Sequence, residues 1–173
     1  IGTVIESGIE SGKGVVSTIL ITKGKLKKGD LIIVGEEFGK ARLLLNEDNS
    51  ELDTVTPSLP VKVFGLSSAP NAGDELRVVD TERQGREISS LRKQRRRTIK
   101  ASNKNADKMQ DFIKKSMDSS KQKKLALVIK TDVQGSAEAI KDSLIKLTTE
   151  DVGIDIISTG VGGISESDIN LAE

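Results

Sequence analysis

Several residue types that carry chemistry are missing from this chain of 173 residues. It has no cysteine, which excludes disulfides and thiolate metal sites, and no histidine, which excludes an imidazole base or metal ligand. It also lacks tryptophan and tyrosine, and its phenylalanines are only Phe38, Phe64 and Phe112. The aromatic platforms on which single-stranded nucleic acids stack are therefore not expected here.

The chain also lacks a long apolar run and a signal-peptide pattern. A membrane helix needs about 18 or more consecutive apolar residues, so we expect a soluble, intracellular protein with no membrane partner. The sequence starts inside a strand-like pattern at Ile1 and stops soon after a glycine-rich turn. We therefore expect it to be a piece of a longer polypeptide.

Charge is balanced overall but segregated along the chain. There are 27 Lys and Arg against 26 Asp and Glu. Net charge is −4 over residues 1–82, +11 over residues 83–124 and −6 over residues 125–173, which agrees with the overall value of +1. A basic segment between two acidic ones predicts a polyanionic partner for the middle of the chain.

The first 80 residues read as short strands separated by turn residues. We expect strands at residues 2–7, 14–22, 31–34, 40–45, 61–66 and 75–79. Short strands at regular spacing predict a closed β-barrel. Its expected core includes four large apolar side chains, which are Leu26, Ile32, Val63 and Leu76.

A glycine-leucine-glycine-aspartate pattern marks one turn of this barrel. Gly24 and Gly29 can adopt positive φ at two bends, and Leu26 between them can fill the barrel end. Asp30 can accept hydrogen bonds from turn amides. The simplest interpretation of these residues is structural, and Gly73 and Asp74 repeat the pattern before the last strand.

Residues 80–118 are highly charged and poor in turn residues. Their apolar positions predict one or two exposed helices, with a break near residues 101–105 and a polar linker near 116–124. The basic run supplies six candidate contacts to RNA phosphates, which are Arg92, Lys93, Arg95, Arg96, Arg97 and Lys100. Lys40 and Arg42 are candidates on the barrel. A solvated helix between domains, with no RNA role, explains the run equally well from charge alone.

The last 50 residues predict a β-α-β unit followed by a second helix. We expect strands at 125–130 and 152–158, and helices at 137–147 and 165–172. Gly135 should permit the turn after the first strand, and Ser136 should cap the first helix. Ser165 should cap the second. A unit this small is incomplete, so further strands should follow in the parent chain.

Three patterns resemble ligand sites without meeting their requirements. Residues 8–14 resemble a phosphate-binding loop, but the glycine spacing is too short, so we expect a hairpin loop. Gly160, Gly162 and Gly163 resemble a dinucleotide fingerprint that lacks its final glycine. They more simply form a tight turn, although an anion at the following helix N-terminus stays open. Asp132, Glu138 and Asp142 suggest a solvated acidic face. We therefore predict no catalytic, cofactor-binding or metal-binding residue.

The amino-acid sequences of two regions resemble bacterial-type translation initiation factor 2. Residues 24–32 look like the second-domain barrel shared by translational GTPases, and residues 132–136 and 160–164 look like the third domain of that factor. The resemblance implies a barrel at 1–80, a basic helical linker at 81–122, and the first part of an α/β/α domain at 123–173. The predicted fold class is thus β followed by α/β: a domain II-type β-barrel, a connecting helix and a partial α/β/α sandwich.

The resemblance also implies a function for the parent protein. Such a factor is a GTPase that places initiator tRNA on the small ribosomal subunit and promotes joining of the large subunit. Its middle portion is expected to contact small-subunit ribosomal RNA and the factor's other domains, and to relay the nucleotide state toward the tRNA-binding domain. GTP and Mg²⁺ would bind in a G domain outside this sequence, so this portion should be non-enzymatic and free of cofactors. The expected location is the bacterial cytoplasm or an organelle matrix or stroma.

Two other classes stay open at this stage. The chain could be an interaction or scaffold module without an RNA role. It could also be part of an α/β nucleotide-binding enzyme that uses the glycine turn at 160–163, although the absence of histidine and cysteine argues against that.

Overall fold

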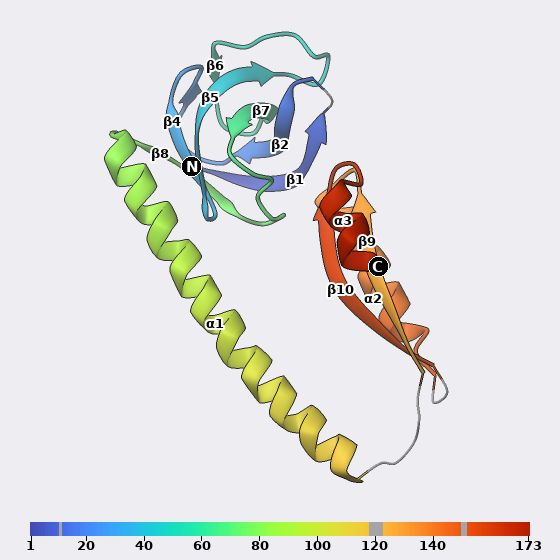
Figure 1. Ribbon diagram of the computed structural model, residues 1–173. Coiled ribbons are helices and arrows are strands. Elements are labelled where there is room, and N and C mark those ends of the chain that lie inside the picture. The colour runs from blue at the N-terminus through green and yellow to red at the C-terminus, as the bar shows by residue number, and fades with distance from the viewer. Residues whose placement is uncertain (11, 118–122, 150–151) are drawn as a thin grey trace.

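Six strands of the first 80 residues close into an antiparallel barrel in the order β1-β2-β7-β5-β4-β8 (Figure 1). The structure, a computed structural model, describes residues 1–10, 12–117, 123–149 and 152–173. Within these ranges, the side chains of residues 100–123 are not described. The barrel strands are β1 (Gly2–Glu10), β2 (Gly14–Ile21), β4 (Leu31–Val34), β5 (Glu37–Leu45), β7 (Pro60–Leu66) and β8 (Glu75–Val79). Two short strands, β3 (Leu26–Lys27) and β6 (Thr54–Val55), pair separately. The predicted fold class is confirmed.

The barrel core consists of aliphatic side chains that point inward from every strand. All four predicted core residues are at most 1% exposed, namely Leu26, Ile32, Val63 and Leu76. Inward and outward side chains alternate along a strand, so each buried residue leaves its neighbours on the outer surface. In β5, Ala41 is fully buried while Lys40 and Arg42 on either side are exposed.

The predicted turn chemistry of the barrel is present. Gly24 and Gly29 have φ of 75° and 96°, in the region that favours glycine. The Asp30 carboxylate accepts a hydrogen bond from the Lys27 amide at 2.8 Å. Residues 8–14, in which residue 11 lies outside the described part of the chain, belong to the β1–β2 hairpin, where Gly14 pairs with Glu10.

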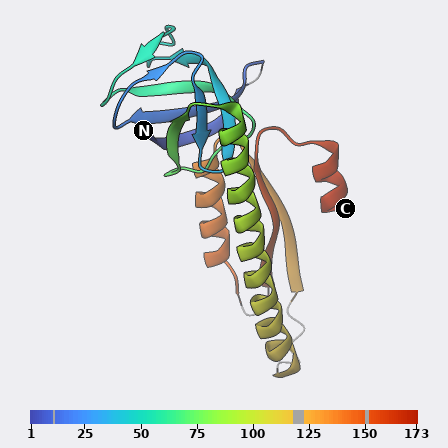
Figure 2. The same cartoon turned by 90° about the vertical axis from the view of Figure 1, so that its left-hand side faces the viewer.

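A single helix, α1 (Glu82–Met117), follows the barrel. It begins beside Thr81, whose hydroxyl accepts a hydrogen bond from the Gln84 amide at 3.3 Å. The predicted break near residues 101–105 is wrong, because that stretch holds no proline or glycine and its asparagines weaken a helix only slightly. Both views show α1 leaving the barrel and extending well beyond it (Figures 1 and 2). Most of the predicted polar linker, residues 118–122, lies outside the described residues.

The remaining residues form the predicted β-α-β unit and a last short helix. Its elements are β9 (Lys123–Thr131), α2 (Gln134–Lys146), β10 (Val152–Val161) and α3 (Glu166–Ala172), with β9 and β10 parallel. The prediction that Gly135 forms a turn and Ser136 caps a helix is wrong. The helix starts earlier, at Gln134, with Val133 at the N-cap position. The turn is instead held by Asp132, whose carboxylate accepts a hydrogen bond from the Val133 amide at 2.9 Å.

The barrel contacts the β-α-β unit through the end of β1. Gly8 forms an isolated bridge with Val133, and a Cβ atom on Gly8 would lie 2.9 Å from the Asp132 carbonyl oxygen. Opposite, a Cβ on Gly162 would lie 3.1 Å from the Ile9 side chain. A glycine on each side thus permits the close approach. Among the described helices, none combines the length and apolarity needed to cross a bilayer.

Candidate nucleic-acid interface

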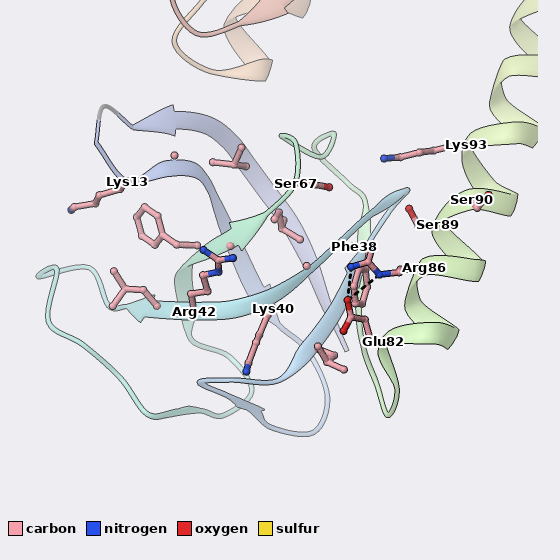
Figure 3. A pocket seen from close by; sticks show the side chains of 18 of the residues that line it. Lys13, Phe38, Lys40, Arg42, Ser67, Glu82, Arg86, Ser89, Ser90 and Lys93 are labelled. Carbon is pink, nitrogen blue, oxygen red and sulfur yellow. Dashed lines mark hydrogen bonds and ion pairs between the residues drawn. The ribbon is translucent and has the colours of Figure 1, made fainter.

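An open groove of about 1240 Å³ lies between the outer surface of the barrel and the first turns of α1 (Figure 3). Six of its lining side chains are cations and one, Glu82, is acidic. The barrel wall contributes Lys13, Lys40 and Arg42, and the helix wall contributes Arg86, Lys93 and Arg97. The groove is therefore a concentration of positive charge built jointly by the barrel and α1.

Secondary structure explains why these cations converge. Lys40 and Arg42 stand two residues apart on β5, so they share its outer face. Arg86, Lys93 and Arg97 are separated by seven and four residues, so they share one face of the helix. Lys13 lies in the β1–β2 hairpin, far from the others in sequence, and barrel closure brings it to the same opening.

Half of the groove cations have no acidic partner among the described residues. Lys13 pairs with Glu10 at 3.4 Å, Lys93 pairs with Glu37 at 3.0 Å, and Arg86 donates to Glu82 at 2.9 Å. In the described part of the chain, no ion pair involves Lys40, Arg42 or Arg97, and all three are exposed. These three side chains are free to meet an anionic ligand.

The floor of the groove favours a phosphate backbone over stacked bases. Gly39 and Gly65 lie there, where β5 and β7 approach so closely that a Cβ on either would overlap backbone atoms of the other strand. Phe64 is only 3% exposed, with the Lys13 ammonium 5.7 Å from its ring centroid. The Arg86 guanidinium lies 6.0 Å from the Phe38 centroid. Neither ring offers an open face to a base, whereas the cations suit phosphate oxygens.

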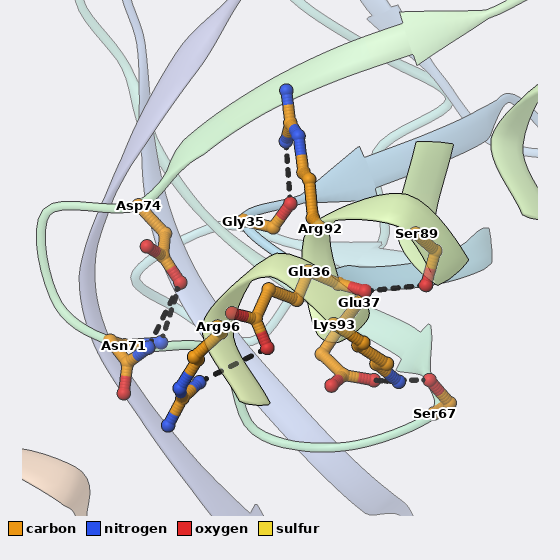
Figure 4. A network of polar contacts seen from close by, with 10 residues as sticks. All are labelled: Gly35, Glu36, Glu37, Ser67, Asn71, Asp74, Ser89, Arg92, Lys93 and Arg96. Atoms are coloured by element: carbon orange, nitrogen blue, oxygen red, sulfur yellow. Dashed lines mark hydrogen bonds and ion pairs between the residues drawn. The ribbon is translucent and has the colours of Figure 1, made fainter. Parts of the chain in front are cut away.

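The side of α1 that faces the barrel holds the helix in place, and it overlaps the groove wall at Ser89 and Lys93 (Figure 4). The Ser89 hydroxyl and the Arg92 guanidinium donate to the carbonyl oxygens of Glu36 and Gly35, each at 2.5 Å. Arg96 pairs with the Glu36 carboxylate at 3.2 Å. The Glu37 carboxylate accepts from both Lys93 at 3.0 Å and Ser67 at 2.6 Å. The β4–β5 turn is thus the docking point for the helix.

The structure sorts the predicted RNA contacts into different roles. Lys40, Arg42 and Arg97 line the groove, and Arg92 and Arg96 contact the barrel. Lys93 does both, because it lines the groove and pairs with Glu37 of the barrel. Arg95 lies two residues from both Lys93 and Arg97, about 200° around the helix, and faces away from the groove. Lys100 lies in α1, and its side chain is outside the described ones. The sequence interpretation missed Lys13 and Arg86, although helical spacing from Lys93 could have indicated Arg86.

The glycine-rich turn near residue 160 leads into a short helix whose start already carries a carboxylate. Gly160 lies inside β10, Gly162 has φ of 104° and Gly163 borders open space. Ser165 caps α3 as predicted, in a capping box with Asp168. The Asp168 carboxylate accepts from the Ser165 amide at 2.8 Å, so a negative charge already occupies this helix start. Across the described residues, no cluster of acidic side chains could hold a metal ion.

Asp168 is expected to titrate well below an ordinary aspartate. Hydrogen bonds from the Ser165 hydroxyl and amide, and then the Lys130 ammonium at 2.9 Å, lower the pKa of Asp168 from 3.8 to about 2. A carboxyl whose pKa is depressed by folding stabilises the fold above its unfolded pKa. That contribution should be intact above pH 4 and lost as pH falls through about 2.

The measurement is a titration of the Asp168 carboxyl carbon by NMR. Ser165→Ala and Lys130→Gln should each raise the midpoint toward 3.8, whereas Lys141→Gln, on exposed α2 surface, should leave it unchanged. A wild-type midpoint near 3.8 would contradict the assignment.

Two family models match consecutive parts of the chain. The model for elongation factor G domain 2 matches residues 1–79, and the model for translation-initiation factor 2 matches residues 98–173. Among solved structures, GDP-bound aIF5B from Aeropyrum pernix aligns with a TM-score of 0.43 and 21% identity, over 98% of this chain and 27% of that one.

Two relatives are similar along nearly the whole chain. The translation initiation factor IF-2 of Ruthia magnifica is 43% identical over 171 residues, which is 99% of this chain and 21% of that protein. The translation initiation factor IF-2 of Buchnera aphidicola is 44% identical over 173 residues, which is 99% of this chain and 20% of that protein. The chain thus spans about a fifth of the length of these relatives. From this identity along nearly all its residues, the chain belongs to the bacterial-type translation initiation factor 2 family.

Proposed function

We propose that this segment acts in translation initiation by holding the phosphate backbone of small-subunit ribosomal RNA in the groove between the barrel and α1. The observation that carries this proposal is the convergence of six cations from the barrel and α1, three of which have no ion-pair partner among the described residues. Lys and Arg that meet phosphates supply affinity and orientation without reading base sequence.

Family membership supports the wider part of the proposal. The parent would place initiator tRNA and promote subunit joining, and this portion would relay the nucleotide state between its G domain and its tRNA-binding domain. Residues 1–80, 81–122 and 123–173 would serve as barrel, linker and the first part of the α/β domain. The segment itself would be non-catalytic and free of cofactors, with GTP and Mg²⁺ bound elsewhere in the parent, in the bacterial cytoplasm or an organelle.

The test is the salt dependence of binding to purified small ribosomal subunits. In the triple variant Lys40→Gln, Arg42→Gln, Arg97→Gln, three unpaired cations are removed while side-chain length is largely kept. If all three meet phosphates, the slope of log affinity against log salt should flatten by about 2–3 units, because each contact contributes roughly 0.7–0.9.

The matched control is Arg95→Gln, which removes a charge from the same basic run but from the opposite face of α1. It should leave the slope unchanged. Equal slopes for wild type and the triple variant would rule out the groove as the RNA site. Binding that is insensitive to salt would favour a scaffold module without an RNA role.

A further inference from the structure

The groove exists only while α1 lies against the barrel, since each element supplies one wall (Figure 3). We propose that groove occupancy and docking of α1 are thermodynamically linked, so that a phosphate backbone touching both walls holds the helix on the barrel. This inference rests on the proposed function, because it takes the groove to be the polyanion site. It adds that RNA sets the position of α1.

The contact between α1 and the barrel contains little hydrophobic surface. The buried residues that the described part of α1 places there are Gly85 and Ser89, and the barrel core includes no side chain from α1. Of the large apolar residues in the described part of α1, Leu91 and Ile99 are 60% and 52% exposed, and Ile88 is half-buried. Small polar interfaces of this kind permit relative motion of the parts they join.

The ion pairs at the contact leave their cations partly exposed to solvent. Arg96 and Glu36 keep 44% and 22% of their side-chain surface exposed, and Lys93 and Glu37 keep 38% and 13%. Exposed pairs stabilise little and are screened by salt. The docked position of α1 is therefore held mainly by hydrogen bonds from Ser89 and Arg92, and an additional ligand contact can shift its population.

A polyanion distinguishes the docked helix from the undocked one. With α1 docked, the groove offers three cations on each wall, whereas the barrel alone offers only Lys13, Lys40 and Arg42. A ligand shifts an equilibrium by its difference in affinity for the two states, and the coupling is reciprocal. Loss of docking should therefore flatten the salt slope for duplex RNA by up to about 2.7 units, at about 0.9 per contact.

Gly85 allows docking to be disturbed without touching a groove cation. A Cβ at this position would overlap the Phe38 ring, and Gly85 does not line the groove. Gly85→Leu, and then Gly85→Leu with Ser89→Leu, place bulky side chains between helix and barrel while favouring the helix itself. Ser89 lines the groove but carries no charge, so Gly85→Leu alone is the variant that leaves the groove lining unchanged. Gln84→Leu is the control, because Gln84 is exposed and lies about 180° from Lys93 on the helix.

The absence of cysteine makes the position of α1 measurable. Spin labels on Asp48→Cys, in an exposed barrel loop, and Ile99→Cys, on the exposed helix, report their separation with and without a short RNA duplex. In the Gly85 variants we expect the distance between the two labels to increase, or the distribution of distances to broaden. When duplex RNA is added, the distance should return toward the wild-type value. Affinity and salt slope should fall in the same variants and stay at wild-type values in Gln84→Leu.

Two results would overturn the linkage while leaving the proposed function intact. One is an undocked helix, seen from the label distance, with an unchanged RNA slope. The other is a label distance that neither variant alters, since docking would then be too strong for RNA to control. If wild-type protein shows no salt-dependent binding at all, the proposed function itself fails.

Discussion

Gly65→Ala should destabilise the barrel by about 3–5 kcal/mol, combining backbone strain with a steric clash. Gly65 has φ of 115°, a conformation that side chains disfavour. Its Cβ would overlap the Lys40 carbonyl oxygen, which belongs to the neighbouring strand and cannot rotate away. To make room, β5 must separate from β7, and the register shift between Gly39 and Leu43 marks the place where their pairing is already irregular. Urea unfolding followed by far-UV circular dichroism measures the change.

Gly73→Ala separates the two causes. Gly73 also has positive φ, at 84°, but a Cβ there meets no atom within 4 Å. Its substitution should cost only the conformational strain, roughly 1–2 kcal/mol. Equal losses for the two alanine variants would show that the approach of β5 and β7 is not tight. Because Gly65 lies on the groove floor, its variant should also weaken RNA binding, whereas Gly73→Ala should not.

Leu26→Ala should cost about 2–5 kcal/mol of barrel stability through lost burial and the remaining cavity. Leu26 is 1% exposed, belongs to the main core cluster and pairs with Val55 across the short β3–β6 sheet. That sheet has only two residues per strand, and its buried side chains Leu26 and Val55 both belong to the core cluster. Chemical unfolding of the whole chain, followed by circular dichroism, gives the free-energy difference.

The control for Leu26 is another leucine of the barrel region. Leu59 is 51% exposed, so Leu59→Ala should change stability by no more than about 0.5 kcal/mol. A loss near zero for Leu26→Ala would contradict its place in the core. Comparable losses for both leucines would mean that burial does not determine the cost.

Patterns that repeat along the chain predicted the barrel well. Strands 31–34 and 75–79 were predicted with their observed bounds, since glycine, proline and aspartate turns delimit them. The β3 and β6 strands were missed because two residues are too few to show alternation. The start of α2 was misplaced because the Asp132 side chain organises the preceding turn, so neither Gly135 nor Ser136 is needed there.

The groove was predicted only in part because it depends on tertiary contacts. Basic residues that are neighbours in sequence, such as Arg95, Arg96 and Arg97, point in three directions on a helix. Lys13 joins the site through barrel closure, which no local pattern encodes. The docking role of Ser89 and Arg92 depends on the backbone of the β4–β5 turn, where Glu36 and Gly35 present their carbonyl oxygens. Arg96 depends instead on the Glu36 carboxylate in the same turn.

The length of α1 gives its short docking contact a large geometric effect. The helix has 36 residues, and the contacts described with the barrel end at Arg96. At 1.5 Å per residue the part of α1 from Arg96 to Met117 is about 32 Å long, so a tilt of about 10° at the docking contact displaces the far end by roughly 5–6 Å. Small rearrangements of the Glu36 and Glu37 contacts would thus be magnified several-fold in space. A small change in the docking angle of α1, made beside the groove, would therefore move the far end of the helix by several ångströms.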